Sequence, residues 1–231
     1  MTLPPIPEAL LLDAGNTLVF LDHAAVSHVL AQEGVRVPPA RLLRGEGRAK
    51  RQYTGFLRGG GSHEAGWFQL VAGMLREAGA PPERVDPLTR RLREVHDELN
   101  LWRRVPEGLP EALERARRAG IRLAVVSNSE GKLPALFERV GLAGLFEAVV
   151  DSSLEGVRKP DPEIFRRALG RLDVRAEQAC YAGDLPEVDV EGARAVGMHA
   201  VLVDPFGFYD DYTGAPRVSG VAELVRTWLE G

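Results

Sequence analysis

Short apolar runs alternate with amphipathic segments along the second half of the chain, and this alternation constrains the fold more than any other feature. After Pro106, segments of helical period separate continuous apolar runs at residues 121–126, 148–150, 179–182 and 199–203. Alternating strands and helices indicate parallel βαβ units with right-handed crossovers. Strands that are apolar throughout are typical of a sheet that helices cover on both faces. We therefore predict a doubly wound parallel α/β sheet.

The N-terminal part of the chain differs, because helices follow a single predicted strand at residues 9–13. From Asp22, a good N-cap, helices are expected over about 22–33, 38–53, 62–78 and 82–102, with Gly59-Gly60-Gly61-Ser62 as a flexible break. Gly45 and Gly47 weaken the second of these helices. No strand is expected among them. We therefore predict a small all-helical domain, residues 21–103, inserted into a core of residues 1–20 and 104–231.

The composition excludes several classes of protein. A chain of 231 residues with 45% hydrophobic and 27% charged residues is typical of a soluble globular protein, and a net charge of -4 gives no bias toward nucleic acid. The single cysteine, Cys180, excludes a disulfide framework. We expect no signal peptide, because residues 1–7 lack a positive region followed by an apolar core, and no apolar run reaches the length of about 18 residues that a membrane span needs. We expect a cytoplasmic protein, without nucleic-acid or membrane partners, that is a monomer or a homodimer.

Polar side chains stand where the predicted strands end: Asp13, Ser127-Asn128, Asp151, Asp184 and Asp204. Because the carboxyl ends of parallel strands meet at one edge of a sheet, we expect these side chains to converge. Buried carboxylates so close together repel one another unless a cation lies between them, and oxygen ligands without His or Cys favour Mg²⁺. Lys159, in the loop after residues 148–150, is a point charge suited to a phosphate or to a carboxylate.

Four segments in order carry these residues: Asp13-Ala14-Gly15-Asn16-Thr17-Leu18, Val125-Val126-Ser127-Asn128, Lys159-Pro160-Asp161-Pro162, and Gly183-Asp184 with Asp189. Together they resemble the motifs of the haloacid dehalogenase (HAD) superfamily of phosphatases, phosphonatases and dehalogenases. The resemblance covers nearly the whole chain, including a helical cap inserted after the first strand. It implies a Rossmann-like core and a Mg²⁺-dependent phosphatase that acts on a small phosphorylated metabolite.

The same resemblance implies catalytic and metal-binding roles. Asp13 would attack phosphorus and form an aspartyl-phosphate. Mg²⁺ would be held by Asp13, the backbone carbonyl of Gly15 and Asp184. Asp189 would support the metal through water or orient Lys159.

Substrate-binding roles are implied as well. Ser127 and Lys159 would bind the transferring phosphoryl oxygens. Thr17 would hold the first loop, and Asn128 would help to position Ser127.

One position departs from the family pattern. Phosphatases of this family usually carry a second aspartate two residues after the nucleophile, as general acid and base, and this chain has Gly15 there. A missing general acid/base typically costs about 10²–10⁴-fold in rate. Asn16 cannot replace it, because an amide does not titrate usefully. His23, near the entry to the helical domain, is a titratable group that could.

Three functions therefore stay open: a phosphatase slowed or rescued by another group, a phosphonatase-like enzyme, and a catalytically silent protein that binds a phosphorylated ligand or a protein. The phosphonatase-like branch lacks the second aspartate and uses a cap lysine. Lys50 is the lysine of this cap, but its neighbours predict a solvated side chain. Haloacid dehalogenation is disfavoured, because the fourth segment resembles the metal-using motif.

Specificity is expected to come from the helical domain. Its arginines at helical spacing are predicted to form a solvated face; they are Arg41, Arg44, Arg48 and Arg51. Trp67 and Trp102 fit the core of that domain. The aromatic and acidic segment 206–212 is expected either to pack on the cap or to form a dimer contact.

Overall fold

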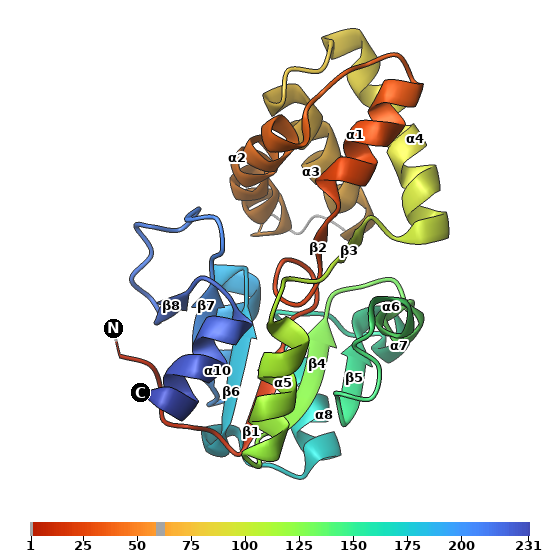
Figure 1. The fold of residues 1–231 in the computed structure, drawn as a ribbon. Helices are drawn as coiled ribbons and strands as arrows, with labels where there is room; N and C mark the ends of the chain where they lie inside the picture. The colour runs from red at the N-terminus through yellow and green to blue at the C-terminus, as the bar shows by residue number, and fades with distance from the viewer. Residues whose placement is uncertain (1, 59–62) are drawn as a thin grey trace. The chain divides into compact units, whose positions relative to one another are not determined.

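A computed structural model describes residues 2–58 and 63–231, and the chain divides into two compact units (Figure 1). The sheet unit comprises Met1–Phe20 and Arg104–Gly231, and the helical unit comprises Leu21–Arg103. The predicted break at Gly59-Gly60-Gly61-Ser62 lies outside the described residues. No helix in the described ranges is long and apolar enough to cross a membrane.

A six-stranded sheet in the order β5-β4-β1-β6-β7-β8 is the frame of the sheet unit. Its strands are β1 Ala9–Leu12, β4 Arg122–Ser127, β5 Ala148–Asp151, β6 Ala179–Gly183, β7 His199–Val203 and β8 Arg217–Val218. All neighbouring strands pair in parallel. The doubly wound parallel sheet predicted from the sequence is therefore confirmed. From the central β1 the strand order runs outward in both directions, and open α/β sheets bind ligands at the carboxyl edge of such a switch point.

Helices cover both faces of this sheet (Figure 1). In the view shown, α5 Leu109–Arg118 and α10 Val221–Glu230 lie in front of it, and α8 Pro162–Leu172 lies behind. The short α6 Leu133–Val140, α7 Ser152–Glu155 and α9 Glu191–Arg194 complete the unit. Asp161 caps α8 as predicted, because its side chain accepts the N–H of Glu163 at 2.9 Å.

The helical unit contains α1 His23–Gln32, α2 Pro39–Arg58, α3 His63–Glu77 and α4 Pro82–Leu99. Asp22 caps α1 as predicted, accepting the N–H of Ala25 at 2.9 Å. The expectation that this segment holds no strand is wrong. Trp102 lies not in a helix but in β3 Trp102–Arg104, which pairs with β2 Phe20–Leu21. Strands this short leave no periodicity to detect in the sequence.

The helix α2 continues through Gly45 and Gly47, and Gly45 lies where α2 packs against α3. A Cβ at Gly45 would lie 2.5 Å from the carbonyl oxygen of Met74, so the two helices approach closely at this point. The four arginines predicted to form a solvated face are all exposed; they are Arg41, Arg44, Arg48 and Arg51. Trp67 is buried in the core of this unit, and Trp102 packs against that core.

The prediction that the side chain of Lys50 is solvated is wrong, because Lys50 is only 3% exposed. It lies one helical turn from Glu46 and one from Thr54, and the three form a buried stripe along α2. The charged neighbours of Lys50 in the sequence point to other faces of the helix.

Candidate functional site

Asp13 stands at the carboxyl end of β1, the central strand of the sheet. Its backbone N–H donates to the carbonyl of Ala182 at 3.0 Å, so the pairing with β6 continues one residue beyond the strand. The chain then folds back on itself, because the N–H groups of Leu18 and Val19 both donate to the carbonyl of Ala14 at 2.9 Å. This tight loop leaves the Asp13 carboxylate at the sheet edge, 7% exposed.

Two further carboxylates lie beside Asp13. Asp184 follows β6 directly, and Asp189 lies in η2 Pro186–Val190, a π-helical turn. One oxygen of each of the three carboxylates lies within 4.8 Å of the others, and the exposed fractions are 7%, 4% and 1%. Among the described residues this is the group of side chains that could hold a metal ion.

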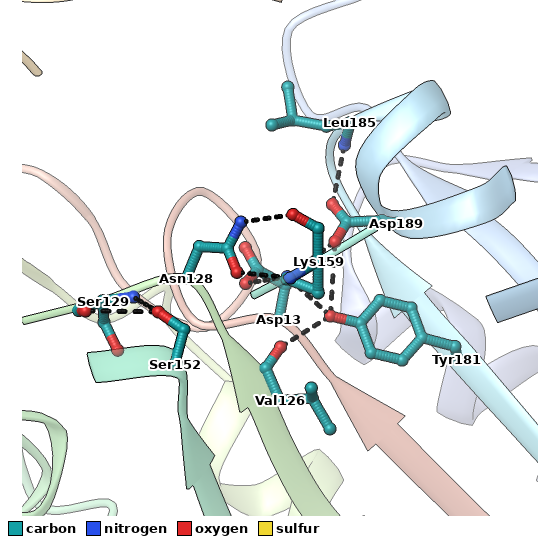
Figure 2. A network of polar contacts seen from close by, with 9 residues as sticks. All are labelled: Asp13, Val126, Asn128, Ser129, Ser152, Lys159, Tyr181, Leu185 and Asp189. Carbon is teal, nitrogen blue, oxygen red and sulfur yellow. Dashed lines mark hydrogen bonds and ion pairs between the residues drawn. The ribbon is translucent and has the colours of Figure 1, made fainter. Parts of the chain in front are cut away.

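Lys159 balances part of this negative charge. Its Nζ donates to Asp13 Oδ1 at 2.6 Å, to Asp189 Oδ1 at 2.6 Å and to the hydroxyl of Tyr181 at 2.8 Å (Figure 2). Burial lowers the pKa of the ammonium, but Asp13 and Asp189 outweigh this effect, and the pKa lies above its ordinary value. Lys159 is therefore a cation at neutral pH.

The pKa values of two of the carboxylates are raised as well, but here burial is the main cause. Burial raises the pKa of Asp13 above its ordinary value; Lys159 lowers it and the charge of Asp184 raises it further. Burial also raises the pKa of Asp189, which Lys159 lowers and Asp13 raises. Three close carboxylates with one ammonium leave an excess of negative charge, and a divalent cation would relieve it. Oxygen-only ligands fit a hard cation of the Mg²⁺ type.

Gly183 makes room for the carboxylate of Asp189. A Cβ at position 183 would lie 2.4 Å from Asp189 Cγ, which is closer than any real side-chain contact. The N–H of Leu185 donates to Asp189 Oδ2 at 2.9 Å, so both oxygens of this carboxylate are held. Glycine at the end of β6 is thus required by close approach.

Asn128 and Ser127 lie at the end of β4 and have different partners. Asn128 Nδ2 donates to the carbonyl of Lys159 at 2.9 Å, and its Oδ1 accepts the N–H of Lys159 at 2.8 Å (Figure 2). The amide therefore fastens the backbone of Lys159 to β4. Ser127, 4% exposed, hydrogen-bonds to Asp13 and lowers the pKa of that carboxyl.

The first loop holds two buried polar atoms that have no hydrogen-bond partner among the described residues, Asn16 Oδ1 and Thr17 Oγ1. Asn16 adopts the left-handed conformation, with φ of 54°. Gly15 forms an isolated bridge with Val19. Gly15 and Thr17, which were predicted to bind the metal and the substrate, therefore belong to the loop that follows Asp13. The two buried oxygen atoms without a partner are available to hydrogen-bond a bound group.

Two of the strand-end acids predicted to converge here have other partners. Asp151 accepts the N–H groups of Gly131 at 2.9 Å and of Ser153 at 3.0 Å. Asp204 accepts the N–H groups of Phe208 at 2.8 Å and of Tyr209 at 3.0 Å. Neither belongs to the group of carboxylates around Asp13. Backbone N–H groups, which no side-chain pattern reveals, stabilise these two carboxylates locally. Asp204 is also paired with Arg217, whose Nη1 lies 3.3 Å from Asp204 Oδ2.

The aromatic segment 206–212 packs within the sheet unit. The ring of Phe206 contacts Phe20 edge-on, with centroids 5.9 Å apart, and Asp204 holds the turn that follows. Tyr209 and Tyr212 pack against the core behind the sheet.

His23, the sequence candidate for the missing acid/base, lies in the helical unit. Its Nε2 is 2.8 Å from Glu46 Oε2, and both side chains are buried. The second oxygen, Glu46 Oε1, is buried without a hydrogen-bond partner among the described residues.

Tyr181 is the residue of this site that the sequence reading missed. It is fully buried in β6, and its hydroxyl contacts Lys159. Burial, with Asp189 and Asp13 beside it, raises the pKa of the phenol well above its usual value, so Tyr181 stays neutral. The sequence did hold a sign of this role, because Tyr181 stands in an otherwise apolar strand and a buried tyrosine hydroxyl needs a hydrogen-bond partner.

Comparison with known proteins gives a consistent result. Residues 7–197 match the family model of haloacid dehalogenase-like hydrolases. Haloacid dehalogenase-like hydrolase domain-containing protein 3 from Bos taurus is 38% identical over 138 residues, 59% of this chain and 55% of the bovine protein. A phosphoserine phosphatase from Thermus thermophilus is 40% identical over 134 residues, 56% of this chain and 51% of that enzyme. The chain thus spans about half the length of these curated relatives.

The fold has counterparts among solved structures. The HAD-hydrolase YfnB from Bacillus subtilis, bound to magnesium, superposes with a TM-score of 0.69 at 18% identity, covering 96% of this chain and 98% of that one. At this level of identity the likeness concerns the fold.

Proposed function

The chain belongs to the haloacid dehalogenase-like hydrolases, and from this premise we propose that it is a Mg²⁺-dependent phosphatase of small phosphomonoesters that works through an aspartyl-phosphate. The observation that carries the proposal is the ammonium of Lys159, 2.6 Å from Asp13, within a group of three buried carboxylates. The Thermus relative named a phosphoserine phosphatase supports a small phosphorylated substrate. Residues 21–103 would be the cap, and the cytoplasmic location stays a prediction from the sequence.

In the first half-reaction a carboxylate oxygen of Asp13 forms a bond to phosphorus, and the P–O bond to the leaving alcohol breaks. Lys159 compensates the charge of the transferring oxygens and keeps Asp13 oriented. The hydroxyl of Ser127, which already contacts Asp13, donates to the same oxygens. Asp13, the Gly15 carbonyl and Asp184 would hold Mg²⁺, which would supply further charge neutralisation.

In the second half-reaction water attacks the phosphorus of the acyl phosphate, and inorganic phosphate leaves while Asp13 is regenerated. Both half-reactions involve a proton: the leaving alkoxide needs one, and the attacking water loses one. Because position 15 has no side chain, the sheet unit lacks the usual carboxylic acid for these transfers. Slow turnover with an accumulating aspartyl-phosphate is therefore expected. That His23 replaces the missing general acid/base stays a prediction from the sequence.

One observation favours a second candidate, phosphonatase-like cleavage of a C–P bond. A lysine that forms a Schiff base must be desolvated, and Lys50 is buried. Trapping by borohydride in the presence of a phosphonate aldehyde, lost in Lys50→Arg, would select this candidate.

Hydrolysis of p-nitrophenyl phosphate with and without Mg²⁺ tests the main proposal. We expect release that requires the metal and disappears in Asp13→Asn, together with a phosphorylated species in the intact mass of the wild type. Arg158→Gln, in the same loop as Lys159, serves as the matched control and should retain turnover. No metal-dependent release from clean protein would refute the phosphatase proposal and leave the phosphonatase-like and the catalytically silent alternatives.

A further inference from the structure

The side chain of Tyr181 crosses the centre of the sheet. Tyr181 lies in β6 opposite Leu11 of β1, and β4 lies on the other side of β1. Its hydroxyl donates to the carbonyl of Val126 in β4 at 2.7 Å (Figure 2). The phenol therefore spans three adjacent strands just below the carboxyl edge, where Asp13 begins the first loop.

The proton of this hydroxyl has one good acceptor. Val126 O is 2.7 Å away, whereas the next acceptor, Asp189 Oδ1, is 3.3 Å away. With its proton directed to Val126, the oxygen turns a lone pair toward Lys159 Nζ, 2.8 Å away. The phenol is thus a fixed hydrogen-bond acceptor, set by the backbone of β4.

The ammonium of Lys159 has three N–H donors, and three oxygens accept them. Two belong to Asp13 and Asp189, each at 2.6 Å, and the third is the phenol. The acceptors come from the end of β1, from η2 and from β6, so they fix the nitrogen from three directions. The phenol is neutral, so it can hold the ammonium without competing with phosphate for its charge.

We infer that Tyr181 is a positioning residue for catalysis: it holds the ammonium of Lys159 against the carboxylate of Asp13. The inference rests on the proposed function for its kinetic consequence. Without the hydroxyl, one buried N–H of Lys159 loses its acceptor, and the ammonium shifts toward other oxygens. Misplacing a catalytic group by about 1 Å can cost about 10²-fold in rate.

A double-mutant cycle between Tyr181→Phe and Lys159→Ala tests the inference. Tyr181→Phe keeps the ring that packs edge-on against Phe165, with centroids 5.2 Å apart. We expect it to lower kcat for p-nitrophenyl phosphate by about 10- to 100-fold in the wild-type background and to cost nothing further in Lys159→Ala. Tyr212→Phe, a tyrosine packed on the same core outside the site, is the control and should leave kcat unchanged.

Equal losses in both backgrounds, or wild-type kcat in Tyr181→Phe, would overturn the inference while leaving the phosphatase proposal intact. If the wild type hydrolyses no phosphoester, the proposed function fails, and a second measurement still decides the positioning.

That measurement uses the ¹⁵N ammonium signals of protein labelled at its lysines, of which the sequence contains only Lys50, Lys132 and Lys159. We expect a slowly exchanging ammonium signal that is absent from Lys159→Ala and that exchanges faster in Tyr181→Phe. A wild-type Lys159 signal in fast exchange, or one that Tyr181→Phe leaves unchanged, would show that the hydroxyl does not hold the ammonium.

Discussion

Gly183→Ala places a methyl group where the structure holds the carboxylate of Asp189. The new Cβ would lie 2.4 Å from Asp189 Cγ and 2.6 Å from Oδ2. Asp189 cannot move away freely, because one oxygen accepts from Lys159 at 2.6 Å and the other from the N–H of Leu185 at 2.9 Å. The substitution must therefore displace either the carboxylate or the end of β6.

The magnitude follows from these contacts. Overpacking a filled core costs about 1–3 kcal/mol. Losing a hydrogen bond to a charged group costs about 1.5–3 kcal/mol. Because the two terms overlap, we expect the free energy of unfolding to fall by about 3 kcal/mol, which corresponds to a Tm lower by roughly 6–12 °C for a chain of this size. Turnover should fall as well, because Lys159 loses one of its two carboxylate partners.

The assay must report on the sheet unit alone, since the two units need not unfold together. Trp228 in α10 serves this purpose in a background with Trp67→Phe and Trp102→Phe, which removes the tryptophans of the helical unit. Urea unfolding followed by Trp228 fluorescence then gives the free energy of unfolding for each variant.

Gly170→Ala is the matched control, because a Cβ at this helical position in α8 meets nothing within 4 Å. It should be neutral or stabilising by up to about 1 kcal/mol. If Gly183→Ala unfolds within about 0.5 kcal/mol of Gly170→Ala, a difference expected of ordinary surface substitutions, the fixed position assigned to Asp189 is wrong.

Two further predictions concern the chemistry of single side chains. Gly15→Asp supplies the missing acid/base and should raise kcat for p-nitrophenyl phosphate by about 10²–10⁴-fold, whereas Gly15→Ala should not; equal rates would show that another group already moves the protons. Burial raises the pKa of the Cys180 thiol to about 12 from 9.0, so a thiol reagent at pH 8 should react only as the protein unfolds. Because the thiol ionises at lower pH in the unfolded chain, Cys180 should lower the free energy of unfolding as the pH rises from 9.0 toward 12. Rapid labelling of the native protein by the thiol reagent would contradict the burial of Cys180.

Local physical rules were enough to predict much of this protein. Continuous apolar runs between helical segments specify a covered parallel sheet, because only such a sheet buries both faces of each strand. Asp22 and Asp161 cap their helices through contacts within three residues, which the sequence alone specifies. The order of the strand-end motifs was likewise sufficient for the family.

Tertiary structure decided the points that depend on contacts between distant residues. Asp151, Asp184 and Asp204 each stand at the end of a predicted strand in the sequence. In the structure, backbone N–H groups of nearby turns donate to Asp151 and Asp204, and of the three acids only Asp184 lies beside Asp13. Lys50 is buried although Arg48 and Arg51, close to it in the sequence, are exposed, because helical geometry places these residues on different faces. Tyr181 reaches Lys159 only because β6 lies beside β1, and no pattern within either strand reveals that pairing.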